Sequence, residues 1–380
     1  MAIRNDPGAT IRAGGTLATS GFDLRSLSVP TILLIAFVGL LAACMTGALN
    51  LYMQTVLMFM GINIIMSTSL NLINGNMGEF ACGHAAFMAV GAYVSSLVTV
   101  ILFTQSKFGA PLLPPELALL AFPLALLIGS LAAAVVGLLI AIPSFKTRGD
   151  YLAIITIAAL YIVKSAIENI DAIGGARGFM GMRRVTNAME QTLDLPWMVI
   201  WIFIGTVFTV WIIRRYVSST YGKGVMAICQ DEVAAEIMSV NTNHIKLVTF
   251  MLSSGLAGLA GGLFAHVLGY INPGSFTILK STEALVMVYL GGMGSLSGAV
   301  MSAMLFTLLL ESLRFIIPWI DQLLHLIHVL PAGYEISQVW KWVLIPLLLI
   351  LLMQFRPEGI MGNRELSDIF PRLRKFYKFK

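Results

Sequence analysis

The sequence predicts an all-α membrane protein: a polytopic transmembrane helix bundle of about ten spans with broken helices, and with the N- and C-termini cytoplasmic. Composition favours this class, because 58% of the 380 residues are hydrophobic and only 11% are charged. Soluble domains carry about 25% charged residues. The apolar residues also gather into ten long blocks with short polar segments between them. Little chain remains for a soluble catalytic domain.

Except for the eighth, the ten blocks are long enough for membrane spans, which need about 20 apolar residues each. They cover residues 28–49, 52–74, 80–103, 117–142, 150–167, 197–216, 247–271, 279–293, 297–318 and 339–355. The chain therefore divides into an N-terminal tail at 1–27, a transmembrane domain at 28–355 and a C-terminal tail at 356–380. The last tail is basic, with seven Lys or Arg against three Asp or Glu.

Basic residues set the orientation, because cytoplasmic loops are enriched in Lys and Arg. Such residues follow the fourth and sixth blocks, which places segment 217–246 in the cytoplasm. The eighth block, 279–293, is short. If it crosses, the basic tail at 356–380 is cytoplasmic; if it does not, that tail is outside, against the rule. We therefore count ten spans, although the length of the eighth block leaves open whether it crosses fully.

Segment 217–246 contains a short predicted helix. The stretch from Asp231 to Val240 begins with two acidic residues, and Val233, Ile237 and Val240 then recur at helical spacing. This spacing gives the helix one apolar side for a partner. Because an isolated helix of this length is marginal in water, we expect docking on a partner to order it.

Motifs for catalysis or for cofactor binding are missing from the sequence. The run Gly222-Lys223-Gly224 lacks the Ser or Thr that follows the lysine of a phosphate-binding loop. Cys44, Cys82 and Cys229 have no paired spacing, and we interpret them as small buried side chains rather than as a disulfide or metal framework. We therefore expect no enzymatic activity, no metal and no cofactor in this chain.

A polar, glycine-rich stretch separates the second and third apolar blocks. A helix broken at membrane depth exposes backbone groups, which is tolerated only beside protein or a water-filled cavity. One interpretation is therefore the wall of a polar pathway; the other is a cytoplasmic turn whose glycines serve close packing. For the run Gly291–Gly298 we favour the turn. The candidate pathway residues are Asn71, Asn74, Gly83, His84 and Thr156.

Small residues recur every four positions on the seventh block, at Ser254, Gly258 and Gly262. Ala257 and Gly261 repeat the pattern alongside them. Such surfaces allow transmembrane helices to approach closely. The sequence predicts tight helix packing here and leaves open whether the partner helix belongs to this chain.

Several stretches together are similar to the permease subunits of branched-chain amino acid ABC importers, of the LivM type. They lie in order between residues 55 and 362: Ser69–Tyr93, Arg148–Ile154, Gly174–Gly178, Ala227–Gly262, Gly291–Gly298, Glu311–Arg314 and Phe355–Gly359. The chain departs from the family pattern at Ser239, where Gly is usual. It also has Gly174-Gly175-Ala-Arg177-Gly178 in place of the usual Gly-Gly-Pro-Asn-Gly.

The resemblance implies a transport subunit in the bacterial inner membrane that moves branched-chain or other neutral amino acids. Its implied partners are a second related permease, two cytoplasmic ATPase subunits that bind the ATP, and an external substrate-binding protein. The family's ATPase-contacting loop falls within segment 217–246. The residues that this assigns to ATPase coupling are Asp231, Glu232, Ala234, Ala235, Ile237 and Ser239.

Two other functions remain open from the sequence. A urea or short-chain amide ABC permease would share the same architecture. An ion-coupled secondary transporter would need ionisable residues inside the membrane as a relay, and the sequence offers few: Glu311, Glu168 and Lys164. Glu311 also stands three residues before Arg314, so a purely structural ion pair competes with that interpretation.

Overall fold

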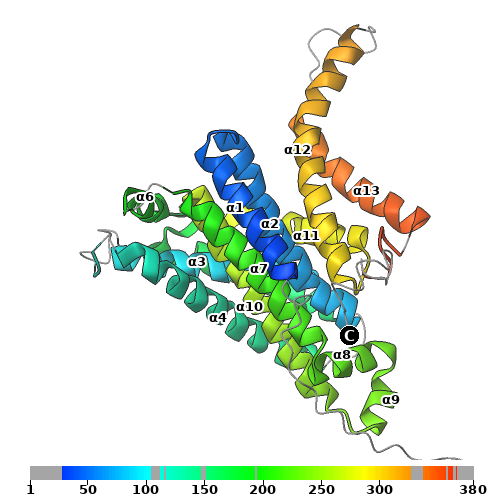
Figure 1. Cartoon of the computed structure of the whole chain (residues 1–380). Coiled ribbons are helices and arrows are strands. Elements are labelled where there is room, and N and C mark those ends of the chain that lie inside the picture. Colours follow the sequence, from blue (N-terminus) through cyan, green and yellow to red (C-terminus); the bar gives the residue numbers. More distant parts are fainter. Residues whose placement is uncertain are drawn as a thin grey trace, which may run out of the picture.

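The computed structural model confirms an all-helical architecture (Figure 1). The structure describes residues 28–103, 112–114, 117–146, 151–192, 195–326, 337–356, 358–362 and 365, so the tail at 1–27 and most of the tail at 356–380 lie outside the described residues. Each of the ten predicted apolar blocks coincides with a helix. These are α1 (Ser28–Met45), α2 (Leu51–Asn71), α3 (His84–Phe103), α4 (Ala118–Ser144), α5 (Tyr151–Glu168), α7 (Trp197–Val217), α10 (Thr242–Leu268), α11 (Ile278–Gly291), α12 (Leu296–Leu326) and α13 (Lys341–Phe355).

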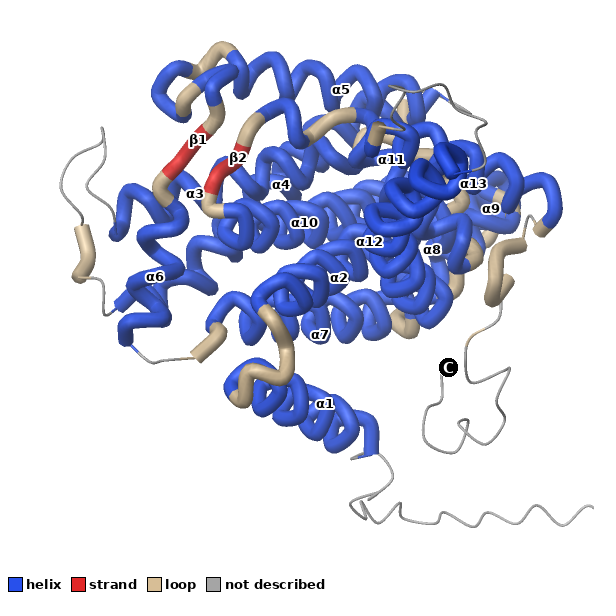
Figure 2. The backbone as a smooth tube through the Cα atoms, turned by 90° about the horizontal axis from the view of Figure 1, so that it is seen from above, coloured by secondary structure: helices blue, strands red, loops and turns tan. Residues whose placement is uncertain are grey.

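Short elements connect the long helices. The π-helical turn η1 (Leu72–Met77) continues α2. Helix α5 is followed by η3 (Asp171–Ile173), η4 (Gly175–Arg177), β1 (Phe179–Met180) and α6 (Met182–Thr192), and α7 is joined to α10 by α8 (Thr220–Gln230) and α9 (Glu232–Ile237). Helix α11 is preceded by β2 (Tyr270–Ile271) and η5 (Pro273–Ser275), and α13 by η6 (Gln338–Trp340). Strands β1 and β2 pair antiparallel, with Phe179 opposite Ile271 (Figure 2).

Seven of the described helices are long and apolar enough to cross a membrane: α2 together with η1, α3, α4, α5, α7, α10 and the first 27 residues of α12. The apolar part of α1 is shorter, and so are helices α11 and α13. Helix α11 has 14 residues, or about 21 Å, against a hydrocarbon core of about 30 Å. The non-helical chain that leads into α11 is itself buried at Ile271 and Phe276. The count of ten spans and the cytoplasmic termini remain predictions.

The centre of the bundle consists of α3, α4 and α10, which meet through small residues. A Cβ atom added at Gly91 of α3 would lie 2.1 Å from the carbonyl oxygen of Gly258. A Cβ atom added at Gly258 would lie 2.4 Å from the Cβ of Ala133 on α4. The predicted packing surface on α10 is therefore confirmed, and its partner helices belong to this chain.

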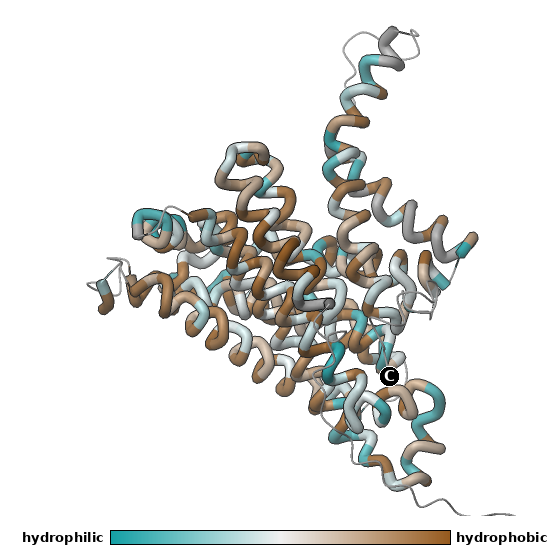
Figure 3. Tube along the Cα trace, in the orientation of Figure 1, coloured by the Kyte–Doolittle hydropathy of each residue, from teal (hydrophilic) through white to brown (hydrophobic). Residues whose placement is uncertain are grey.

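Hydropathy divides the surface of the molecule. The trace of α4 is coloured largely as hydrophobic (Figure 3), and its exposed side chains include Leu120, Leu131 and Leu139. Hydrophilic residues gather instead around α8 and α9 at one end of the bundle. An apolar outer face on long helices is typical of contact with lipid. Helices α12 and α13 diverge from the rest of the bundle (Figure 1).

Candidate functional site

The predicted helix break lies between η1 and α3, where residues 78–83 are not helical. Helix η1 ends at Gly78, whose φ of +74° lies in the left-handed region that favours glycine. In the segment that follows, backbone N–H groups lack the regular partners of a helix. Buried N–H groups of this kind must find other acceptors.

Side chains provide those acceptors. The Oδ1 atom of Asn74 accepts a hydrogen bond from the N–H of Ala81 at 3.2 Å. The hydroxyl of Thr156, on α5, accepts one from the N–H of Cys82 at 3.1 Å. Gly83 permits this approach, because a Cβ there would lie 1.9 Å from the Thr156 carbonyl oxygen. Asn74, Gly83 and Thr156 are thus brought together around the break.

His84 begins α3 immediately after the break. Its Nε2 atom lies 2.9 Å from the hydroxyl oxygen of Ser69, and its ring meets Phe87 edge-on. Its Nδ1 atom is buried without a hydrogen-bond partner among the described residues. That nitrogen is available to a further polar group. The next residue is also held by a side chain, since the N–H of Ala85 donates to the Ser281 hydroxyl at 3.0 Å.

Asn71 lies three residues before Asn74 and holds the turn between α11 and α12. Its Oδ1 atom accepts the N–H of Gly294 at 3.0 Å, and its Nδ2 atom donates to the carbonyl of Ser295 at 3.1 Å. On the other side of the turn, Glu365 accepts the N–H of Leu296 at 2.8 Å. The run Gly291–Gly298 is therefore a turn, as expected. A role for the five candidates in a polar pathway remains a prediction.

The predicted cytoplasmic helix is formed as α9. The Oδ1 atom of Asp231 accepts the N–H of Ala234 at 3.0 Å and caps the N-terminus of the helix. At the C-terminus, the N–H of Ser239 donates to Glu236 and that of Val240 donates to Ala235. This bonding pattern requires a left-handed residue after the helix, and Ser239 takes it with φ +63°. A glycine would adopt the same conformation without strain.

The predicted coupling residues differ in their exposure to solvent. Ala235 is buried against the chain, whereas Ala234 is exposed. The apolar side chains available to a partner are Val233 (66% exposed), Ile237 (77%) and Met238 (78%). The predicted apolar side included Val240 in place of Met238. That assignment was wrong, because the helix ends at Ile237 and the left-handed turn brings Val240 back toward the chain.

Helix α9 is also bonded to other parts of this chain, and its ordering by docking on a partner remains a prediction. Glu236 accepts a hydrogen bond from the Thr242 hydroxyl at 2.9 Å. The Nζ atom of Lys246 lies 2.8 Å from Glu232 and 2.7 Å from Glu79. The Lys246 side chain is only 8% exposed. A single ammonium thus joins α9, α10 and the first residues of the break.

A second cluster of charge lines a cavity of about 490 Å³ between α2, α10, α11, α12 and α13. The Nζ atom of Lys280 lies 2.7 Å from Glu283, and Arg314 lies 3.4 Å from Glu311, which confirms the predicted ion pair. The remaining polar lining consists of Asn63, whose amide donates to the Thr307 hydroxyl at 2.9 Å, and of Lys341.

Lys280 and Glu283 were not among the site residues predicted from the sequence. They stand three positions apart at the start of the short eighth block, which is the spacing of an ion pair on a helix. That signal was available. No pattern in the sequence predicts that this pair lines one cavity together with Glu311 and Arg314, because that depends on how α11 packs against α12.

Comparison with known proteins places these features in context. Residues 52–353 match the family model described as the permease component of the branched-chain amino acid transport system. The chain is 27% identical to the high-affinity branched-chain amino acid transport system permease protein LivM of Escherichia coli strain K12, over 79% of this chain and 68% of that protein. It is 22% identical to a probable LivM of Methanocaldococcus jannaschii, over 84% and 95%.

A second kind of permease is also similar. The LivH permease protein of the same system in Escherichia coli strain K12 is 26% identical over 40% of this chain and 42% of its own length. No solved structure matches this chain.

The hydrogen bond from Cys82 to Thr156 predicts how the break responds to a small change. Thr156→Val keeps the shape of the side chain and leaves the Cys82 N–H unsatisfied, which costs about 1–3 kcal/mol. We expect the break to open more often, so that a small maleimide modifies Cys82 about tenfold faster than in the parent chain. In that parent chain the burial of the Cys82 side chain slows the reaction.

Cys229 was predicted to be buried but is exposed. Its side chain lies beside Gly78 at the start of the break, so it is replaced by Ala in both proteins. Cys44 on α1 supplies the control, and its modification rate should be the same in both proteins. An unchanged rate at Cys82 would show that the Thr156 hydroxyl does not hold the break.

Proposed function

Because the chain belongs to the family of branched-chain amino acid transport system permease components, we propose that it is one permease of an ABC importer for branched-chain or other neutral amino acids. The importer contains a second related permease, two cytoplasmic ATPase subunits that bind the ATP, and an external substrate-binding protein. The similarity of this chain to both LivM and LivH supports a pair of related permeases. This chain is a multi-pass protein of the inner membrane.

The observation that carries the proposal is α9. It presents Val233, Ile237 and Met238 to solvent at the hydrophilic end of the bundle (Figure 3). ATP can move a permease only through a contact whose free energy differs between the states of the ATPase. Helix α9 supplies a rigid contact of this kind, with an apolar face of the sort that docks in a groove of a partner.

The chain also connects that contact to its transmembrane part. Lys246 joins Glu232 on α9 to Glu79 at the helix break, and it is itself part of α10. A displacement of α9 by the ATPase therefore acts on α10 and on the start of α3 together. We propose that this charge cluster transmits the ATPase state to the pathway.

The charged cavity suits the substrate class. An amino acid carries an ammonium and a carboxylate, and the cavity places Lys280 and Arg314 beside Glu283 and Glu311. Groups of both signs can therefore meet both ends of a zwitterion. Urea and simple amides have no such pair of charges, and the similar proteins are described as branched-chain amino acid permeases. We propose that the import path passes this cavity.

The exposed face of α9 yields the test of the main proposal. Ile237→Glu places a charge in the apolar contact and should lower copurification of the ATPase subunits at least tenfold, because burying an unpaired charge is costly. Met180→Glu is the matched control: Met180 is apolar and 70% exposed, close to the 77% of Ile237, but lies on β1 far along the chain from α9. Equal ATPase recovery in both variants would reject α9 as the docking element.

The cavity yields a separate test. Glu283→Gln should reduce leucine uptake by the reconstituted importer about tenfold while ATPase copurification stays unchanged; Glu190→Gln, at an exposed glutamate of α6, should have no effect. The exchange Lys280→Glu with Glu283→Lys separates substrate contact from structural pairing. If the exchange restores uptake, the pair is structural and the proposed path is wrong.

A further inference from the structure

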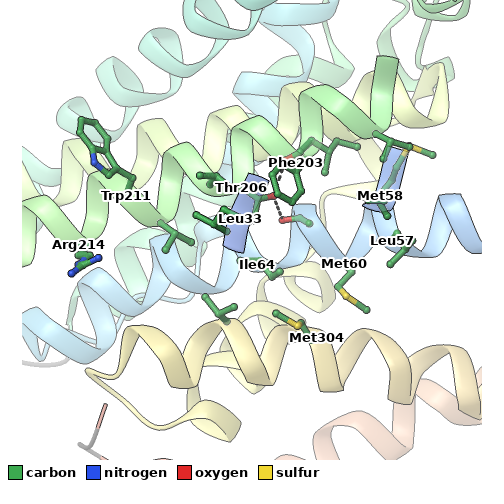
Figure 4. A pocket seen from close by; sticks show the side chains of 17 residues that line it. Leu33, Leu57, Met58, Met60, Ile64, Phe203, Thr206, Trp211, Arg214 and Met304 are labelled. Atoms are coloured by element: carbon green, nitrogen blue, oxygen red, sulfur yellow. Dashed lines mark hydrogen bonds between the residues drawn. The ribbon is translucent and has the colours of Figure 1, made fainter. Parts of the chain in front are cut away.

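A narrow apolar groove of about 410 Å³ lies between α1, α2, α7 and α12 and shares no lining residue with the charged cavity (Figure 4). Its walls are aliphatic, methionine and aromatic side chains, apart from Thr206 and Arg214. The Thr206 hydroxyl bonds back to its own helix, at 2.8 Å from the Ile202 carbonyl oxygen, and also approaches Gly61. Arg214 lies at one end of the groove, beside Trp211.

The groove has the dimensions of a lipid chain. It follows α7 from Val199 to Arg214, a distance of about 22 Å at 1.5 Å per residue. One leaflet of a bilayer contributes about 15 Å of hydrocarbon, and its headgroup region a few ångströms more.

Helix α1 forms the loose fourth wall. It lies apart from the main bundle (Figure 2) and meets α7 at the rings of Phe37 and Phe203, whose centroids are 5.0 Å apart. Leu33 and Leu40 of α1 line the groove. Close-packed interiors leave few voids of this size, so an apolar occupant between α1 and the bundle would complete the packing.

Charge marks the headgroup end. Arg214 and Arg215 form the basic last turn of α7, and basic residues at a helix end favour the cytoplasmic leaflet. Anionic headgroups bind basic sites between transmembrane helices on that side. A guanidinium can bind a phosphate through two parallel hydrogen bonds. The groove therefore has an apolar wall as long as an acyl chain, with a side chain at one end that can bind a phosphate.

We propose that this groove binds an anionic glycerophospholipid of the cytoplasmic leaflet. One acyl chain lies along α7 beneath α1, and the phosphate group meets Arg214. The lipid then fills the space between α1 on one side and α2 and α12 on the other. The proposal rests on the groove and its charge, and it holds whatever the transported substrate is.

The test is lipid retention by the purified full-length chain, measured by native mass spectrometry with added phosphatidylglycerol or phosphatidylcholine. We expect the chain to retain one phosphatidylglycerol in at least tenfold preference. Arg214→Gln should abolish the preference, whereas Arg215→Gln, which removes the same charge from a neighbour outside the groove, should keep it within about twofold. If the two variants lose the preference for phosphatidylglycerol equally, general surface charge explains it and the proposal is overturned.

A second measurement does not depend on removing the arginine. Met60→Trp narrows the groove from α2 without altering charge and should displace the lipid, with both arginines present. In a variant whose other five tryptophans are replaced by Phe, a phosphatidylglycerol with brominated acyl chains should quench the fluorescence of Trp211 more than the brominated phosphatidylcholine does. Equal quenching by the two lipids, or retention of lipid by Met60→Trp, would contradict an acyl chain bound in this groove.

Discussion

The ammonium of Lys246, held between two carboxylates, is the interaction on which the proposed mechanism depends. A lysine side chain that is almost fully buried is stable only when its charge is paired, and its two partners, Glu79 and Glu232, come from different parts of the chain. The Glu79 and Glu232 side chains are 24% and 48% exposed, so the loss of one carboxylate leaves the ammonium paired with the other and costs less than breaking a fully buried pair. Helices α9 and α10 and the start of the break are therefore constrained to move together.

A second constraint acts on the backbone of the break. Polar side chains from α5 and α11 satisfy N–H groups that a continuous helix would bond internally, through Thr156 and Ser281. Asn71 fastens the end of α2 to the turn between α11 and α12. The polar residues in these apolar segments thus hold a non-helical path in place, so a shift at Glu79 reaches several helices at once.

Local features were predictable from the sequence. The apolar blocks matched helices, Asp231 began α9 as its acidic position suggests, and the small residues of α10 packed as expected. Features that join distant residues were not predictable. Glu79 and Lys246 are 167 positions apart, and no periodicity links them. The exposed Met238 was missed because it lies beyond the last helical turn, where helical spacing no longer describes the chain.

The most direct test of this account is the coupling of ATP hydrolysis to substrate in the assembled importer with Lys246 changed. Lys246→Met should leave the ATPase subunits bound through the exposed face of α9 but reduce substrate-stimulated hydrolysis at least tenfold, and Lys246→Arg, which keeps the charge, should restore part of it. Stimulation at the unaltered level in Lys246→Met would contradict the claim that this charge cluster links α9 to the pathway.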